Sequence, residues 1–412
     1  MKMSSKERER RYKLIRKGME EQGVDLIVAA AGAGGSGGRL AANFRYLTNL
    51  DSQGTYVIFP REGAPAVMMG DRFPAEAMRS QEFWVEFETL PTRNYGIAVG
   101  EVLKKRGLDK GTIGLSGFEK NQWTVPANIS YMFYQGLKES LGNGQFVDAT
   151  DIILDARTLK SDEEIEAIAK AEELSGRAIE HLCEIVRPGV TRRELSIELD
   201  HFLRQHGADA GSRIGTKISK TPHANDPNPG PMDKPLENGD LIAVNTGVYI
   251  DGYAGHDRAL ISVGHASERI RAMMDAYMEA QRVFLGQFRP GVTAGELTNA
   301  IHSTVKKAGF QAGAGAVRDY HPIGLEIPEF WGPKFALKDN HPAYGLNPTG
   351  GAGFQIGGAF GYEIAPGMIE AMQIFVGDPE SKTLLEQGGT YAVTQDGYRT
   401  LSTVPDDQLI EI

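Results

Sequence analysis

The chain has little of several features that would point to a function. Cys183 is its only cysteine among 412 residues, so no disulfide can form within it. A reducing, cytoplasmic location is therefore the simplest expectation. Cys183 lies in a helical pattern of apolar residues, which favours a buried, inert thiol over a nucleophile. No apolar run is long enough to span a bilayer, and the charged N-terminus lacks the apolar core of a signal peptide.

Positive charge is also in the minority. The formal net charge is −10, from 44 Lys and Arg against 54 Asp and Glu. This balance disfavours nucleic acid as a partner, and with no membrane segment we expect a small-molecule substrate. The glycine-rich stretch 32–38 is not followed by the Lys-Ser or Lys-Thr of a phosphate-binding loop, so the sequence predicts a plain loop there.

One segment of the sequence occurs twice. Arg-Pro-Gly-Val-Thr stands at 187–191 and again at 289–293, and Glu-Leu follows each copy after two residues. Each copy opens a helical pattern that ends in glycine, at Gly207 and at Gly309, so both copies keep the same length. A long repeat seen only twice is not the pattern of a solenoid. It predicts one domain made of two related halves, with a cleft between them that can hold a site.

The apolar patterns divide the chain into two domains. Alternating strands and helices predict an α/β domain over residues 1–157. Its expected helices cover 6–23, 95–106 and 127–141, and its expected strands cover 25–31, 55–60, 66–70, 112–116 and 145–148. The second domain, 158–412, begins with a capping box of Ser161 and Glu164 that starts a long helix. It holds both repeats and is predicted to be α+β, with antiparallel strands lining the cleft and helices outside.

Several motifs resemble those of prolidase, aminopeptidase P and creatinase, and they follow the order found in that family. They are Asn-Phe-Arg-Tyr-Leu-Thr at 43–48, Leu-Lys-Ser-Asp-Glu-Glu-Ile at 159–165, Gly-Asp-Leu-Ile at 239–242, His-Pro-Ile-Gly-Leu-Glu at 321–326, Pro-Gly-Met at 366–368 and Val-Thr-Gln-Asp-Gly at 393–397. The resemblance covers nearly the whole chain. It implies the pita-bread fold for the C-terminal domain, whose internal two-fold symmetry agrees with the repeat, and an active site in the cleft of that domain.

The resemblance also identifies the positions of metal ligands. Most members of the family bind two divalent metals through two Asp, one His and two Glu, and such metals polarise a carbonyl and activate water. At the corresponding positions this chain has Asn245, His256, His321, Gln373 and Gly388, and only Glu386 is acidic near the last of them. Amide oxygens replace carboxylates poorly around hard cations, so we expect no dinuclear site. A single metal on His256, Asp257 and His321 stays open.

Creatinase is the family's precedent for catalysis without metal. The segment 215–225 resembles the one that carries its general acid/base histidine, which aligns with His223. An imidazole can take a proton from water and return it to a leaving nitrogen without a metal. The resemblance aligns Asp257, within one residue, with a carboxylate that holds the cationic substrate. A second such carboxylate aligns with Gln373, so creatine itself is not the expected substrate.

These expectations combine into one predicted function. We expect a metal-independent hydrolase of a C–N bond in an amide, amidine or cyclic analogue, with His223 and His321 as catalytic residues. The expected substrate-binding residues are Asn245, His256, Asp257 and Gln373. The alternatives are a lyase of a small charged acid resembling dimethylsulfoniopropionate lyase, an Xaa-Pro metallopeptidase with altered ligands, and a non-catalytic binding protein. A homodimer is expected, as in creatinase-like members, with a lid or dimer contact in an insertion at 332–361.

Overall fold

The computed structural model describes residues 3–31, 42–51, 54–70, 83–90, 94–117, 129–223, 230–313, 319–329, 332–337, 361–404 and 407–412. The chain divides into two compact units, Met1–Thr158 and Leu159–Ile412. The glycine-rich stretch 32–38 and most of the predicted insertion at 332–361 lie outside the described residues. Within the described ranges, no helix is long and apolar enough to cross a membrane.

The N-terminal unit is an α/β domain around one six-stranded sheet with strand order β4-β3-β2-β1-β5-β6. Its strands are β1 (Leu26–Ala30), β2 (Tyr56–Pro60), β3 (Ala66–Met69), β4 (Glu86–Thr89), β5 (Thr112–Ser116) and β6 (Gln145–Asp148). Its helices are α1 (Ser5–Gln22), α2 (Ala42–Thr48), α3 (Tyr95–Lys105), α4 (Tyr131–Leu141) and α5 (Thr150–Thr158). The apolar strand β1 pairs with β5 in parallel and with β2 antiparallel, and all its residues are buried.

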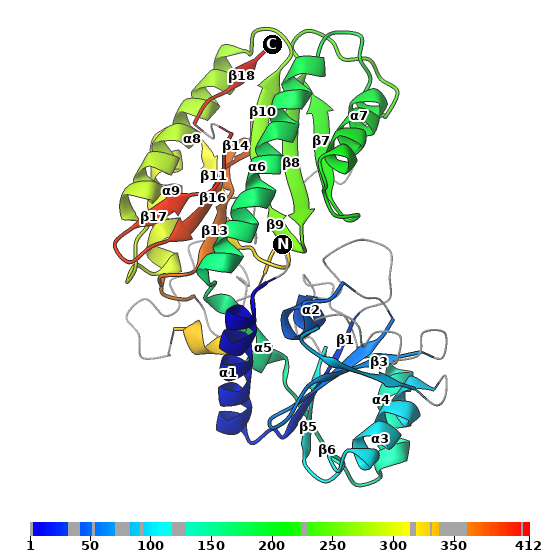
Figure 1. Cartoon of the computed structure of the whole chain (residues 1–412). Coiled ribbons are helices and arrows are strands. Elements are labelled where there is room, and N and C mark those ends of the chain that lie inside the picture. Colours follow the sequence, from blue (N-terminus) through cyan, green and yellow to red (C-terminus); the bar gives the residue numbers. More distant parts are fainter. Residues whose placement is uncertain are drawn as a thin grey trace. The chain divides into compact units, whose positions relative to one another are not determined.

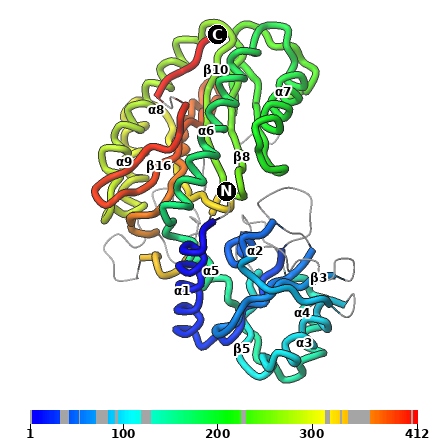
Figure 2. The backbone as a smooth tube through the Cα atoms, viewed as in Figure 1, coloured from blue at the N-terminus to red at the C-terminus, as the bar shows by residue number. Residues whose placement is uncertain are grey.

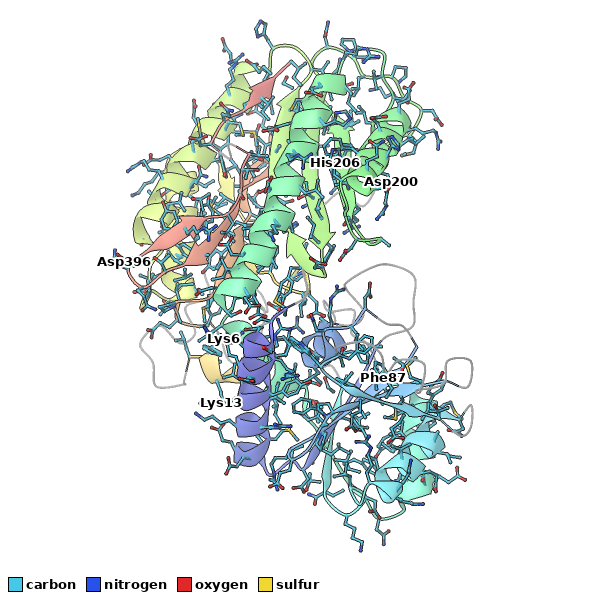
Figure 3. The ribbon with its side chains drawn as sticks, viewed as in Figure 1. Lys6, Lys13, Phe87, Asp200, His206 and Asp396 are labelled. Atoms are coloured by element: carbon cyan, nitrogen blue, oxygen red, sulfur yellow. The ribbon has the colours of Figure 1, made fainter. Side chains whose placement is uncertain are left out.

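Helix α1 shows how local sequence sets the ends and the buried face of an element. Ser4 caps the first turn, and Gly23 ends the helix in the left-handed conformation at φ 66°. Ile15 is buried, whereas Lys6 and Lys13, two turns apart along α1 in Figure 3, are exposed. The expected helix at 6–23 is therefore present with its apolar stripe facing the unit's core.

The other expected elements of this unit differ from the observed ones mainly at their ends. Helix α4 begins at Tyr131 and not at 127, because the Ser130 side chain accepts a hydrogen bond from the Phe133 amide and so caps the helix there. Strand β4 and helix α5 were not expected. The strand lies at the sheet edge with no buried residue, and the helix is short, so neither has a strong apolar pattern.

In the described part of the C-terminal unit, four long helices lie outside a set of mostly antiparallel strands (Figure 1). The helices are α6 (Asp162–Ile185), α7 (Arg192–Gln205), α8 (Glu268–Gln287) and α9 (Ala294–Lys307), with a short 3-10 helix η2 (Pro333–Phe335). The strands of the first half are β7 (Arg213–Ser219), β8 (Leu241–Ile250), β9 (Tyr253–Gly255) and β10 (Arg258–Ser262). The remaining strands are β11 (Gln311–Ala312), β12 (Tyr320–Pro322), β13 (Ile369–Met372), β14 (Ile374–Asp378), β15 (Thr383–Gln387), β16 (Thr390–Val393), β17 (Tyr398–Thr400) and β18 (Ile410–Glu411).

The sequence repeat corresponds to two related halves of this unit. Thr191 caps α7 and Thr293 caps α9, each through a capping box with the glutamate three residues later. The turn before each helix makes the same contact: the Gly189 amide donates to Leu236 O over 2.9 Å, and the Gly291 amide donates to Ile364 O over 3.0 Å. The halves are therefore built alike, and the predicted pita-bread fold is confirmed.

Each half has its own apolar core. Helices α6 and α7 pack with β8 and β10 in one core, while α8 and α9 pack with β13 and β14 in another. In Figure 2 α8 and α9 lie to the left of the strands of this unit and α7 lies to the right, while α6 runs in front of the strands. Strands from the two halves meet where β10 of the first half contacts β15 of the second.

Candidate active site

The predicted ligand positions converge on one arginine. Asn245 on β8 and Arg258 on β10 are directly opposite each other in the antiparallel pair of these strands. The other members come from the end of β9 and from the second half, namely His256, His321, Gln373 and Glu386. We call these six residues the Arg258 cluster. The Arg258 side chain is 1% exposed, so a full guanidinium charge lies at the centre of the cluster.

The guanidinium contacts almost every member of the cluster. Its Nε donates a short hydrogen bond to Oε1 of Glu386. Nη1 donates to the Met372 carbonyl over 2.9 Å. Nη2 donates to Nε2 of His256 over 2.7 Å and to Oε1 of Gln373 over 2.6 Å. Burial of a charge is costly unless it is paired and hydrogen-bonded, and here one carboxylate and three neutral acceptors meet that condition.

His256 is fixed as the neutral tautomer that carries its proton on Nδ1. Nδ1 makes a short hydrogen bond with the Thr246 carbonyl, which can only accept, so Nδ1 must donate. Nε2 faces Nη2 of Arg258, which can only donate, so Nε2 must accept. His256 thus has no nitrogen left for a substrate. It holds Arg258 in place and is itself 5% exposed.

His321 and Asn245 lie on the more open side of the cluster. Nδ1 of His321 hydrogen-bonds with the Pro322 carbonyl over 3.0 Å, and its Nε2 is 3.5 Å from Nη2 of Arg258. Because the two protons of Nη2 already go to shorter bonds, this last contact is weak. His321 is half-buried and Asn245 is exposed, with its Nδ2 3.5 Å from Glu386 Oε1. These two residues keep polar groups that a substrate could use.

Glu386 supplies the carboxylate that the aligned position lacks. At Gly388 an added Cβ would lie 2.1 Å from the Met372 carbonyl oxygen, so no side chain fits there. Glu386 is two residues earlier, at the end of β15, and in a strand such residues point to the same face. Glu386, the acidic residue that the sequence offers near Gly388, therefore places its carboxylate beside Arg258.

Asp257 lies on the opposite face from its two neighbours. Side chains alternate along an extended chain, so His256 and Arg258 point into the cluster and Asp257 points away from it. There it faces Glu172 of α6, and both residues are buried. The geometry therefore does not support the expected roles of Asp257, either in holding a cationic substrate or in sharing a metal with His256 and His321.

The Glu172 and Asp257 carboxyl groups form a buried acid pair. Burial, and then the negative charge of Asp257, raise the pKa of Glu172 well above its usual range. Two carboxyl groups in hydrogen-bonding contact must share a proton. Glu172 also accepts a hydrogen bond from the His256 amide over 2.9 Å, so the pair supports the backbone that carries His256.

Replacing Glu172 by Gln should make the chain relatively more stable as the pH rises. Because the pKa of Glu172 is raised by folding, unfolded chains release this proton above about pH 4.5 while folded chains keep it, which lowers wild-type stability by up to about 1.4 kcal/mol per pH unit. The amide of the variant cannot titrate. The melting temperature of Glu172→Gln minus that of wild type should therefore rise from pH 5 upward. The exposed neighbour Glu173→Gln is the control and should show no such trend.

His223 is placed beside the strand that carries Glu386. Its backbone forms a parallel bridge with Leu384, and the Leu384 amide donates to the Pro222 carbonyl over 3.0 Å. Glu386 follows Leu384 by two residues on β15. The His223 side chain is exposed to solvent. The backbone of His223 therefore lies beside β15 at a point two residues before Glu386.

The cluster is a poor site for divalent metals. Its acceptors are two imidazoles, two amides and one carboxylate, and the charge of that carboxylate is already compensated by Arg258. A dication 4 Å from the guanidinium would meet a repulsion of about 8 kcal/mol at an effective dielectric constant of 20. Among the described residues, no group of His, Cys, Asp or Glu is arranged to hold a metal ion. The donor set therefore does not fit the dinuclear centre that the fold implies.

Arg258 is the site residue that the sequence analysis missed. It directly follows His256 and Asp257, and none of the motifs quoted above covers its position. The signal was available in the strand periodicity, since a residue two places after the second ligand position must share its face. Glu172 was missed for a different reason: it lies in the middle of α6, far from any of the motifs.

Comparison with known proteins agrees with the fold. Residues 166–396 match the metallopeptidase family M24, and residues 11–159 match the creatinase/prolidase N-terminal domain. An Xaa-Pro dipeptidase of Pyrococcus furiosus is 28% identical over 212 residues, which are 50% of this chain and only 59% of that protein. The uncharacterized peptidase YqhT of Bacillus subtilis is 22% identical over 372 residues, or 89% of this chain and 93% of that one.

Solved structures are similar over the full length. An Xaa-Pro dipeptidase from Bacillus anthracis superposes with a TM-score of 0.75 at 21% identity, covering 98% of this chain and all 100% of that one. The dipeptidase PepE from Mycobacterium ulcerans gives 0.74 at 20% identity and covers 100% of both chains. At such identities the likeness concerns the fold alone. Because the match to residues 166–396 covers more than half of the sequence, the chain belongs to metallopeptidase family M24.

Proposed function

We propose that the chain is a hydrolase of a C–N bond in a small polar substrate and that it works without a metal ion. The observation that carries the proposal is the buried guanidinium of Arg258, bonded to His256, Gln373 and Glu386. The Arg258 guanidinium supplies positive charge among the residues that align with the family's metal ligands. Hydrolysis at this site must then rely on proton transfer and hydrogen bonds from side chains.

His223 is the residue that we assign to proton transfer. It would take a proton from the attacking water while the water oxygen bonds to the carbonyl or amidine carbon. It would then return that proton to the nitrogen as the C–N bond breaks. Its exposed side chain beside β15 supports this role. Asn245 and His321 on the more exposed side are the hydrogen-bonding groups that we assign to the substrate, whereas His256 and Gln373 hold Arg258.

A second candidate is the activity that the relatives' names suggest. Several matched proteins are called Xaa-Pro dipeptidases, so a metal-dependent dipeptidase with altered ligands is the main rival. A small peptide is within the substrate class of either candidate. Metal content separates them, because the rival needs ions that the Arg258 cluster is poorly suited to hold. The homodimer and the cytoplasmic location expected from the sequence stay predictions.

Metal analysis is therefore the first test. Protein purified without chelator should carry well under one equivalent of Mn, Zn, Fe or Co per chain, and EDTA should not reduce its activity. The physical reason is the single carboxylate of the cluster, Glu386, whose charge Arg258 already neutralises. Elemental analysis on the protein, with an established family metalloenzyme prepared in parallel, checks this. About two equivalents of metal, with loss of activity in EDTA, would restore the metallopeptidase interpretation.

A further inference from the structure

The Arg258 cluster has the form of a cation-binding site whose occupant is part of the chain. The acceptors that point at Nη2 come from three separate segments: His256 after β9, His321 on β12 and Gln373 between β13 and β14. Acceptors from distant segments converge in this way around a bound ion. Glu386 adds a carboxylate at Nε, which completes a cation site of one negative charge.

We propose that this is a retained cation site filled by the guanidinium of Arg258, and that without this side chain it binds a free guanidinium ion. The hydrogen-bond acceptors of this site still point toward its centre, where a cation would lie. Thr246 keeps a proton on Nδ1 of His256 whether or not Arg258 is present, so in the neutral ring the lone pair stays on Nε2 and faces the site. The inference shares its premise about Arg258 with the proposed function but does not depend on any reaction.

Several supports of the acceptors lie outside the cluster and would survive the loss of Arg258. The backbone amide of Gln373 donates to the backbone carbonyl of Asp319 over 2.7 Å. The Asp319 carboxylate in turn lies 2.7 Å from Nε2 of His302, with which it forms a hydrogen bond. Behind His256, Glu172 accepts from its amide over 2.9 Å. The backbone around the site is therefore fixed independently of its occupant. Removing the arginine side chain should leave a polar cavity and not a collapsed core.

A planar cation is the ligand that the geometry favours. Arg258 uses donors on all three of its guanidinium nitrogens, which lie in one plane. A free guanidinium ion has the same charge, shape and donors. Urea has the same planar shape but no charge and a carbonyl oxygen, so it would leave Glu386 uncompensated. The pair of compounds thus separates recognition of a cation from general solvation.

The test compares Arg258→Ala with Arg269→Ala in the full-length protein. Arg269 is also paired with a carboxylate, that of Asp378, but its side chain is 49% exposed and lies outside the cluster. Guanidinium chloride at tens of millimolar, far below denaturing concentration, should raise the melting temperature of Arg258→Ala by about 3–6 °C when the concentration is about ten times the dissociation constant. Equal urea should not raise it. Arg269→Ala and wild type should not be stabilised by either compound.

Two further measurements complete the test. Glu386→Gln added to Arg258→Ala should abolish the guanidinium effect, because the site then has no negative charge. Wild type titrated with Zn²⁺ in a calorimeter should show no site that His256→Ala removes. The proposal is overturned if folded Arg258→Ala ignores guanidinium, or if urea stabilises it equally. Zn²⁺ binding at His256 in wild type would also overturn it, and this arm needs no folded Arg258 variant. None of these measurements depends on turnover. They can therefore support or overturn this inference even if no hydrolase activity is found.

Discussion

Replacing His223 by Ala should lower turnover about 10²- to 10⁴-fold while leaving substrate affinity nearly unchanged, the usual effect of losing a general acid/base. The substrate would be the compound that wild type hydrolyses fastest in a panel of small amides, amidines, cyclic amidines and Xaa-Pro dipeptides. Steady-state kinetics would give kcat and KM separately. The exposed His201 of α7 is a matched control, since His201→Ala removes an imidazole away from the Arg258 cluster.

Chemical rescue distinguishes a catalytic His223 from a merely structural one. The His223 side chain is exposed, so free imidazole can reach the space that the Ala variant leaves. Added imidazole should restore part of kcat with no change in KM. Full activity of His223→Ala would show that another group moves the proton.

The same proposal predicts which residues of the Arg258 cluster determine substrate affinity. If His223 carries the proton and Arg258 the fixed positive charge, the open-side residues Asn245 and His321 distinguish one substrate from another. Replacing either of them should then change KM more than replacing an exposed residue on the outer helices. The buried members His256 and Gln373 should instead affect stability, because their polar groups are bonded to Arg258. The distinction follows from exposure and not from position in the motif.

Much of the fold could be predicted from the sequence because it rests on local signals. The two Arg-Pro-Gly-Val-Thr segments are followed by capping boxes at Thr191 and Thr293, and both helices begin there. Apolar runs such as Leu26–Ala30 became buried strands. These features depend on residues close in the chain, so a pattern suffices to find them. Strand β4 shows the limit, since its pairing with β3 is visible only in three dimensions.

Most residues of the Arg258 cluster could be identified from the sequence, but Arg258 itself was not. The aligned positions Asn245, His256, His321 and Gln373 do come together, but what they surround depends on side-chain direction. Asp257 was predicted to hold a cationic substrate because it is acidic and aligns within one residue with such a carboxylate. The alternation of side chains along the extended chain instead turns it toward Glu172. Arg258 shares the face of His256, and a long side chain there fills the site. Composition at a position could not show this, whereas strand periodicity could.

Breaking the buried ion pair of Lys160 and Glu329 should cost about 3–5 kcal/mol of stability in the C-terminal unit, because one charge is left buried without its partner. The side chains are 2% and 1% exposed, and Nζ of Lys160 makes a short contact with Oε2 of Glu329. Lys160→Met removes the cation and keeps a similar apolar stem. The exposed Lys170→Met on α6 is the control and should change stability by less than about 0.5 kcal/mol.

This pair also supports a segment of the Arg258 cluster. The Glu329 amide donates to the Pro322 carbonyl over 2.8 Å, and Pro322 directly follows His321. A carboxylate that moves away from Lys160 would therefore loosen the segment that orients His321. Hydrogen exchange of residues 321–329 should become faster in Lys160→Met than in Lys170→Met. The KM of the substrate should rise more than kcat falls, because His321 lies on the open side of the cluster.

A double-mutant cycle shows whether the effect belongs to the pair. Glu329→Gln removes the negative charge and keeps the shape of the side chain. If the cost of Lys160→Met comes from an uncompensated carboxylate, then Lys160→Met with Glu329→Gln should recover most of the lost stability, and the coupling energy should be several kcal/mol. Urea unfolding followed by circular dichroism, analysed for the transition of the C-terminal unit, measures it. Additive losses in the double variant would mean that Lys160 acts through packing of its stem and not through its charge.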